Sequence, residues 1–151
     1  MKPTIDIGYG AKGLILWGER ALVLQKPNGE YDLPGGRVEV GEGFRDGLDR
    51  EIHEETGLRE VQISDRFTLW TFINRQGAVI KGTTWLCWRG IGEVRLSDEH
   101  SDFSWEPLEH LNSLNFYRKY GLDKLDVNSL KECQERRKAY GDLESRRIST
   151  G

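Results

Sequence analysis

The chain has 151 residues, with 22 basic and 25 acidic side chains, which gives a formal net charge of −3 and a pI near 5.7. This balance excludes the strong basic excess of a dedicated nucleic-acid-binding protein, so we expect no stable nucleic-acid complex. The length suits a single domain over residues 1–151, and five residues each of Trp, Tyr and Phe supply a core and exclude intrinsic disorder.

The spacing of apolar residues predicts short strands and a few helices. Strands are expected at Ala11–Trp17, Arg20–Gln25, Val61–Ile73, Val79–Arg89 and Phe103–Trp105. Turns rich in Gly and Pro are expected at 27–29 and 33–36, after the second strand. Helices are expected at Phe44–Thr56, ended by Gly57, at Pro107–Leu111 and at about 128–143. Because strands and helices do not alternate regularly, an α+β fold is favoured over a doubly wound parallel sheet.

Three acidic residues share one face of the helix expected at Phe44–Thr56. Glu51, Glu54 and Glu55 are three and four positions apart, so their side chains lie close together and repel one another. A hard divalent cation such as Mg²⁺ would relieve this repulsion, because it takes carboxylate oxygens as ligands. The alternative is an ordinary acidic helix face in contact with solvent.

Two further features favour the cation. The apolar residues of this helix form a seam beside the acids, made of Phe44, Leu48 and Ile52. The acids therefore border the core instead of facing away from it. Glu42 lies just before the helix, after a loop whose glycines let the backbone approach a ligand closely, namely Gly35, Gly36 and Gly41.

The segment from Gly36 to Leu58 resembles the Nudix box. Its fixed positions are occupied without departure by Gly36, Glu42, Arg50, Glu51, Ile52, Glu54, Glu55, Gly57 and Leu58. A chance match in a chain of this length is on the order of one in 10⁷. The resemblance implies a Nudix-type α/β/α sandwich with a mixed β-sheet. It also implies an enzyme that hydrolyses a nucleoside diphosphate linked to another moiety.

The resemblance further implies roles for individual residues. The metal ligands would be the Gly35 carbonyl, Glu51, Glu54 and Glu55. Mg²⁺ is the expected cofactor, with Mn²⁺ as a substitute, because such an ion acidifies water and neutralises phosphate charge. Glu51 would act as a ligand or as the base, and Glu54 would also belong to the catalytic set. Arg50 would hold a motif glutamate by charge-assisted hydrogen bonds, with Glu42 as a supporting acid.

Four residues outside the fixed positions complete the candidate site. Glu99 lies in a loop where many Nudix enzymes place a further catalytic or metal-binding acid. His100 beside it could transfer protons, although a solvated loop histidine is the alternative. Arg37 and Trp70 are expected to bind substrate. Trp70 could stack on a nucleobase, with a place in the core as its alternative role.

The sequence reduces the number of candidate substrate classes but does not identify one substrate. Residues 72–76 lack the proline of ADP-ribose hydrolases and the tyrosine of dinucleoside polyphosphate hydrolases, and no coenzyme A signature is present. A (d)NTP or a nucleotide sugar is therefore favoured, with ADP-ribose or a dinucleoside polyphosphate as the alternative. A non-catalytic nucleotide-binding module is disfavoured because all box glutamates are present. An isomerase is disfavoured because Cys87, the candidate catalytic cysteine, lies in a predicted strand without a visible acid partner.

The sequence also predicts the surroundings of the protein. The longest apolar run, Gly13–Trp17, is far shorter than the roughly 20 residues that span a bilayer, so no membrane association is expected. Two cysteines and the absence of an apolar signal segment favour the cytoplasm. The expected partner is a nucleotide, and a homodimer remains open.

Overall fold

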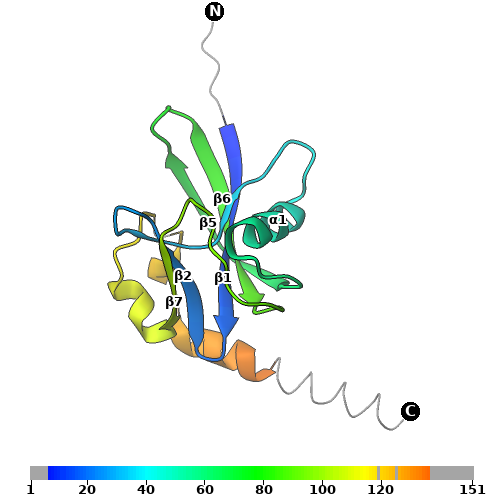
Figure 1. Cartoon of the computed structure of the whole chain (residues 1–151), viewed down its shortest axis with the longest axis vertical. Coiled ribbons are helices and arrows are strands. Elements are labelled where there is room, and N and C mark those ends of the chain that lie inside the picture. The colour runs from blue at the N-terminus through cyan, green and yellow to red at the C-terminus, as the bar shows by residue number, and fades with distance from the viewer. Residues whose placement is uncertain (1–6, 119, 125, 137–151) are drawn as a thin grey trace, which may run out of the picture.

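A computed structural model describes residues 7–118, 120–124 and 126–136 (Figure 1). The strands are β1 (Ile7–Trp17), β2 (Arg20–Gln25), β3 (Tyr31–Asp32), β4 (Gly35–Arg37), β5 (Gln62–Ile73), β6 (Val79–Trp88) and β7 (Asp102–Pro107). The helices are α1 (Phe44–Thr56), the 3₁₀ helices η1 (Leu108–Ser113) and η2 (Leu122–Lys124), and a helix at 127–136. The predicted α+β class is confirmed.

The sheet is built around β1, which lies at the centre of Figure 1. On one side β1 pairs in parallel with β6, from Ile7 opposite Val79 to Leu16 opposite Trp88. On its other side, β1 pairs antiparallel with β4 near its middle and with β2 at its end. The order β3-β2-β1-β6-β5 is completed by β7, which pairs with β2. The sheet is therefore mixed, as expected.

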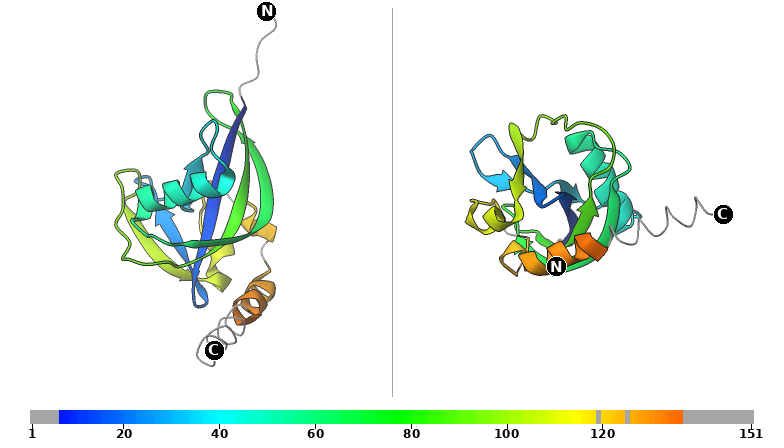
Figure 2. Two further views of the ribbon diagram at one scale, coloured as in Figure 1. Left: turned by 90° about the vertical axis from the view of Figure 1, so that its right-hand side faces the viewer. Right: turned by 90° about the horizontal axis from the view of Figure 1, so that it is seen from below.

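Side chains of β1 alternate between two apolar clusters, as a strand buried on both faces requires. Ala11 and Ile15 pack in the cluster that contains Leu48 and Ile52 of α1. The opposite cluster joins β1 to η1, η2 and the helix at 127–136 through Leu14, Leu16, Leu108, Leu111, Leu122 and Leu130. Helical segments thus cover both faces of the sheet, in agreement with the expected sandwich (Figure 2). Among the described residues, no helix is long and apolar enough to cross a bilayer.

The structure differs from the predicted elements by three residues or more at three places, and it shifts other strand and helix ends by one or two residues. β1 begins at Ile7 instead of Ala11. The sequence pattern missed residues 7–10 because Gly8 and Gly10 are not typical strand residues, but their backbone pairs with β6. Gly35 and Gly36, expected within the turn at 33–36, form β4 with Arg37 against β1, since glycine permits the close approach that this pairing needs. The predicted helix at 128–143 is helical over 127–136, and residues 137–143 lie outside the described residues.

Gly35 is required by two separate constraints. Its φ of 129° suits glycine, and a Cβ there would overlap the Ala11 carbonyl oxygen and lie 2.8 Å from the Lys12 Cα. Gly77, in the turn between β5 and β6, also has a positive φ, of 83°, but a Cβ there would meet no atom within 4 Å. Alanine at Gly77 would therefore introduce backbone strain alone, whereas alanine at Gly35 would introduce backbone strain and steric overlap.

We predict that Gly77→Ala lowers the free energy of unfolding by about 1–2 kcal/mol, the strain of a left-handed backbone with a Cβ. Gly35→Ala should lower it by at least about 3 kcal/mol, because β4 must also move away from β1. Urea unfolding of both variants measures the difference. Equal losses would contradict the close packing of β4 on β1.

Candidate active site

Arg50 lies at the centre of an ion-pair cluster on α1. Its Nε and Nη2 donate to the two carboxylate oxygens of Glu42, at 2.8 and 3.0 Å. Its Nη1 donates to Glu51 at 3.1 Å and reaches Glu54 at 3.4 Å. Nη2 also donates to the carbonyl of Arg37 at 3.2 Å, which ties β4 to the helix. The hydrogen bonds from Arg50 lower the pKa of Glu42 to about 2, so this carboxylate stays charged.

Two glycines make room for these carboxylates. A Cβ at Gly36 would lie 2.8 Å from the carboxylate carbon of Glu51, and a Cβ at Gly47 would lie 2.8 Å from Glu42 Oε1. Glycine inside a helix costs about 0.5–1 kcal/mol relative to alanine. Gly47 is therefore explained by the side chain of Glu42, which lies against its backbone.

Glu55 is the most deeply buried of the motif acids, with only 4% of its surface exposed. Its Oε2 accepts a hydrogen bond from the Gly35 amide at 3.0 Å. Burial raises the pKa of Glu55 to about 7, although the charge of Lys12 opposes this shift. Burial also raises the pKa of Glu51, which Arg50 offsets in part. Buried carboxylates of this kind ionise more readily beside a cation, so the donor set fits a divalent metal ion.

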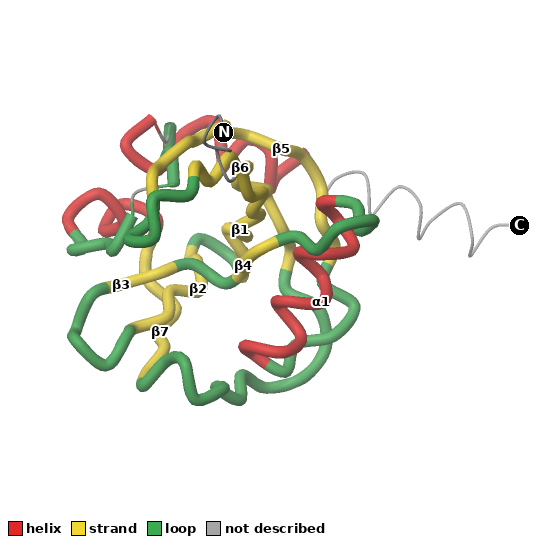
Figure 3. Tube along the Cα trace, turned by 90° about the horizontal axis from the view of Figure 1, so that it is seen from above, coloured by secondary structure: helices red, strands yellow, loops and turns green. Residues whose placement is uncertain are grey.

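The loop between β6 and β7 brings two further groups to this cluster. It runs beside α1, as Figure 3 shows, and the Ser97 amide donates to the Glu55 carbonyl at 3.3 Å. One ligand atom from each of Glu55, Glu99 and His100 lies within 4.8 Å of the others. The loop acid expected from the sequence therefore lies beside Glu55 of the helix.

His100 is buried, which contradicts the alternative of a solvated loop histidine. Its Nε2 lies 3.2 Å from Asp32 Oδ2, and Asp32 in turn pairs with Lys12 Nζ at 3.2 Å. Burial opposes ionisation of Asp32, but Lys12 and His100 outweigh it and lower the pKa of Asp32 to about 2. The imidazole is therefore held in place by a charged carboxylate.

Sequence reasoning missed Lys12 and Asp32. The Lys12 ammonium is buried and also donates to the carbonyls of Leu33, at 3.0 Å, and Gly35, at 3.1 Å. The expected metal ligand at the Gly35 carbonyl thus already accepts a hydrogen bond from a cation. One signal could have revealed Lys12: strand alternation places it on the same face as Leu14, so it points inward.

The two expected substrate-binding residues lie in different surroundings. The Arg37 guanidinium lies close to Gly8 and lines a cavity of about 510 Å³ together with Glu42 and Phe44. Trp70 stacks on Phe72 with 5.6 Å between ring centroids and meets the edge of Tyr120 at 5.0 Å. Its Nε1 donates to Thr84 at 3.0 Å. These contacts of Trp70 all lie outside the motif, so they do not bring it to the glutamates.

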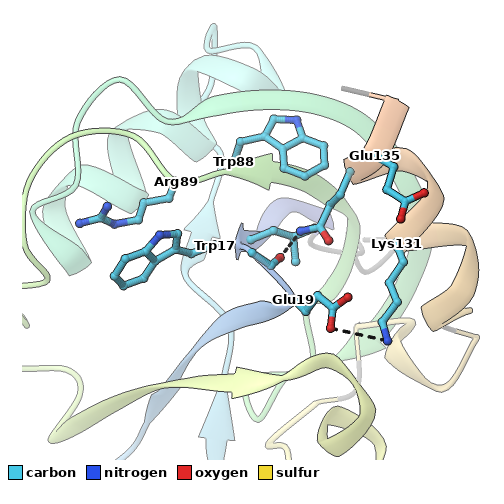
Figure 4. A pocket seen from close by; sticks show the side chains of 9 residues that line it. Trp17, Glu19, Trp88, Arg89, Lys131 and Glu135 are labelled. Atoms are coloured by element: carbon cyan, nitrogen blue, oxygen red, sulfur yellow. Dashed lines mark hydrogen bonds and ion pairs between the residues drawn. The ribbon is translucent and has the colours of Figure 1, made fainter. Parts of the chain in front are cut away.

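A separate cavity of about 510 Å³ lies between the β1–β2 turn, the end of β6 and the helix at 127–136 (Figure 4). Its lining includes Trp17, Glu19, Arg89, Lys131 and Gln134. The Arg89 guanidinium lies 4.2 Å from the centroid of the Trp17 ring. No motif residue lines this cavity, so it is not part of the candidate active site.

Comparison with known proteins agrees with this geometry. The family model described as the NUDIX domain matches residues 8–125. A nucleoside triphosphatase NudI from Escherichia fergusonii is 34% identical over 88 residues, which cover 51% of this chain and 61% of that protein. The chain therefore spans less than two thirds of this curated relative.

Solved structures share the fold. A MutT protein from Methanosarcina mazei Go1 superposes with a TM-score of 0.70 at 23% identity, over 89% of this chain and 99% of that one. An ADP-ribose pyrophosphatase from Streptococcus suis superposes with a TM-score of 0.62 at 21% identity, over 85% and 90% of the two chains. With the family match over most of its length, this chain belongs to the Nudix family.

The buried carboxyl of Glu55 leads to a prediction for the metal-free protein. Its pKa rises from the ordinary 4.5 to about 7 on folding, so between these values the folded state holds the proton that the unfolded chain releases. Stability from this group is thus complete below pH 4.5 and decreases as the pH rises towards 7. Glu55→Gln stays neutral and should remove this part of the pH dependence.

Urea unfolding in the presence of a chelator, at several pH values across this window, measures the effect. Glu93→Gln is a matched control, because Glu93 is exposed and lies in the same loop as Glu99. If the free energies of unfolding of Glu55→Gln and Glu93→Gln both depend on pH as that of the wild-type protein does, the raised pKa of Glu55 is wrong.

Proposed function

We propose that this protein hydrolyses the diphosphate linkage of a nucleoside di- or triphosphate derivative in a reaction that needs a divalent metal ion. The observation that carries the proposal is the convergence of the motif acids with Glu99. Glu51 and Glu54 share the Arg50 guanidinium, and Glu55 lies beside the loop acid. Glu54 and Glu55 would hold Mg²⁺, or Mn²⁺ in its place. When bound, such an ion neutralises charge on phosphate oxygens and makes water more acidic.

The residues of the chain have distinct tasks in this reaction. The water oxygen bonds to phosphorus, the P–O bond of the anhydride breaks, and the leaving phosphate takes the electron pair of that bond. Glu51 is the proposed base that accepts the water proton, because burial raises its pKa and so increases its affinity for a proton. Arg50 orients Glu51 through its hydrogen bond at 3.1 Å. Arg37, which lines the neighbouring cavity, would attract the negatively charged substrate.

The proposed substrate is a (d)NTP or a nucleotide sugar. The relative named as a nucleoside triphosphatase supports the first of these, since its similarity to this chain covers 88 residues. ADP-ribose and dinucleoside polyphosphates are the second candidates, because the fold is shared with proteins named as an ADP-ribose pyrophosphatase and as an Ap4A hydrolase. A nucleotide-binding module without turnover is disfavoured, because every motif glutamate is present.

A substrate panel tests this function directly. The purified chain is incubated with nucleoside triphosphates, nucleotide sugars, ADP-ribose and dinucleoside polyphosphates, each with Mg²⁺ or Mn²⁺, and the products are separated by anion exchange. We expect release of a nucleoside monophosphate from at least one triphosphate or nucleotide sugar. Tight binding of these nucleotides without any product would overturn the proposal.

Replacing Glu54 should separate catalysis from folding. The Glu54 side chain is 55% exposed, so Glu54→Gln should unfold like the wild-type protein while turnover falls by at least about 100-fold through loss of a metal ligand. Asp49→Asn is the matched control, because it removes an exposed carboxylate from the same helix at a variable position of the motif. Near wild-type turnover of Glu54→Gln at saturating Mg²⁺ would show that Glu54 is not a ligand.

A further inference from the structure

The His100 ring has one nitrogen engaged and one without a partner. The side chain is 3% exposed, and its Nε2 lies 3.2 Å from Asp32 Oδ2. Among the residues that the structure describes, no group forms a hydrogen bond with the buried Nδ1. Leaving a buried polar nitrogen without a partner is unfavourable, so such an atom often marks the place of a ligand or an ion.

The surroundings of Asp32 determine which nitrogen carries the proton. The Lys12 ammonium pairs with Asp32 at 3.2 Å, so Asp32 is an ionised carboxylate and can only accept hydrogen bonds. His100 therefore donates from Nε2, and in the neutral ring this leaves the lone pair on Nδ1. A histidine that donates one nitrogen to a carboxylate and keeps the other for a metal is the usual arrangement behind histidine ligands.

Two carboxylates approach the same ring. One oxygen from Glu55, one from Glu99 and a His100 nitrogen lie within 4.8 Å of one another. Since Nε2 faces Asp32, Nδ1 is the nitrogen with capacity for a further ligand. When both carboxylates are ionised, they and the nitrogen lone pair repel one another unless a cation lies among them. The three groups come from α1 and the β6–β7 loop, so only the folded chain assembles them.

We propose that Glu55, Glu99 and Nδ1 of His100 bind a divalent transition-metal ion, which gives this site a preference for Mn²⁺, Co²⁺ or Zn²⁺ over Mg²⁺. Mg²⁺ favours oxygen ligands and retains water, whereas an imidazole nitrogen suits transition metals better. The inference rests on the proposed function, because Glu55 belongs to the acids assigned to the catalytic metal. It deepens that function by assigning His100 to metal selectivity.

Calorimetric titration of the full chain with Mn²⁺ and, separately, with Mg²⁺ tests the nitrogen ligand. His100→Gln should weaken Mn²⁺ binding by about 10–100-fold and change Mg²⁺ binding far less. His110→Gln is the matched control, because His110 is exposed and 3.9 Å from Glu106; it should bind both ions as the wild-type protein does. Equal weakening of both ions in His100→Gln, or no weakening, would overturn the proposal.

A second measurement needs no variant and therefore does not depend on the folding of His100→Gln. Pulsed electron paramagnetic resonance of the Mn²⁺-loaded wild-type protein should show coupling to a ¹⁴N nucleus. A spectrum with oxygen ligands only would overturn the proposal, as expected if His100 is protonated on Nδ1 and donates to the acids instead.

The two proposals fail in different ways. Nitrogen coupling in a protein that hydrolyses no nucleotide would overturn the proposed function alone and support the His100 site. Nucleotide hydrolysis with Mg²⁺, together with no nitrogen coupling, would overturn the His100 ligand alone.

Discussion

The buried ammonium of Lys12 is the interaction on which the arrangement of the candidate site depends. A charged group in the protein interior needs partners for its protons, and Lys12 finds them in Asp32 and in the carbonyls of Leu33 and Gly35. These contacts hold segment 32–35 against β1. From this position the Gly35 amide meets Glu55 on α1, while Asp32 meets the loop histidine. One side chain of β1 therefore positions groups from two other elements.

Two positively charged side chains, Arg50 and Lys12, interact with different acids of the site. Arg50 serves Glu42, Glu51 and Glu54, whereas Lys12 serves Asp32 and reduces the pKa rise of Glu55. Glu39 also lies 3.8 Å from this guanidinium, so one positive charge faces four carboxylates and the cluster keeps a net negative charge. On a helix face exposed to water, solvent would screen the repulsion between these carboxylates. Here Glu51 and Glu55 are partly or fully buried, so the repulsion between the carboxylates is screened less and a divalent cation would relieve it.

Local patterns predicted the elements that carry the motif. The bounds of α1 agree with the prediction because its apolar spacing and the terminal Gly57 are signals within the helix itself. β4 could not be predicted in this way. Its glycines resemble a turn, and only pairing with β1 makes them a strand. The contact between Lys12 and Asp32 was missed for the same reason, since the two residues meet through the pairing of distant segments and not through their spacing.

The sequence by itself determined the family and the positions of the helix acids. Glu51, Glu54 and Glu55 are close in sequence, so the helical repeat alone brings them to one face. Only the tertiary structure decided that Glu99 and His100 join Glu55, and that Glu55 is buried while Glu54 is half exposed. The physical reason is that proton affinity and ligand availability depend on burial and neighbouring charge, which residues far apart in the sequence create together.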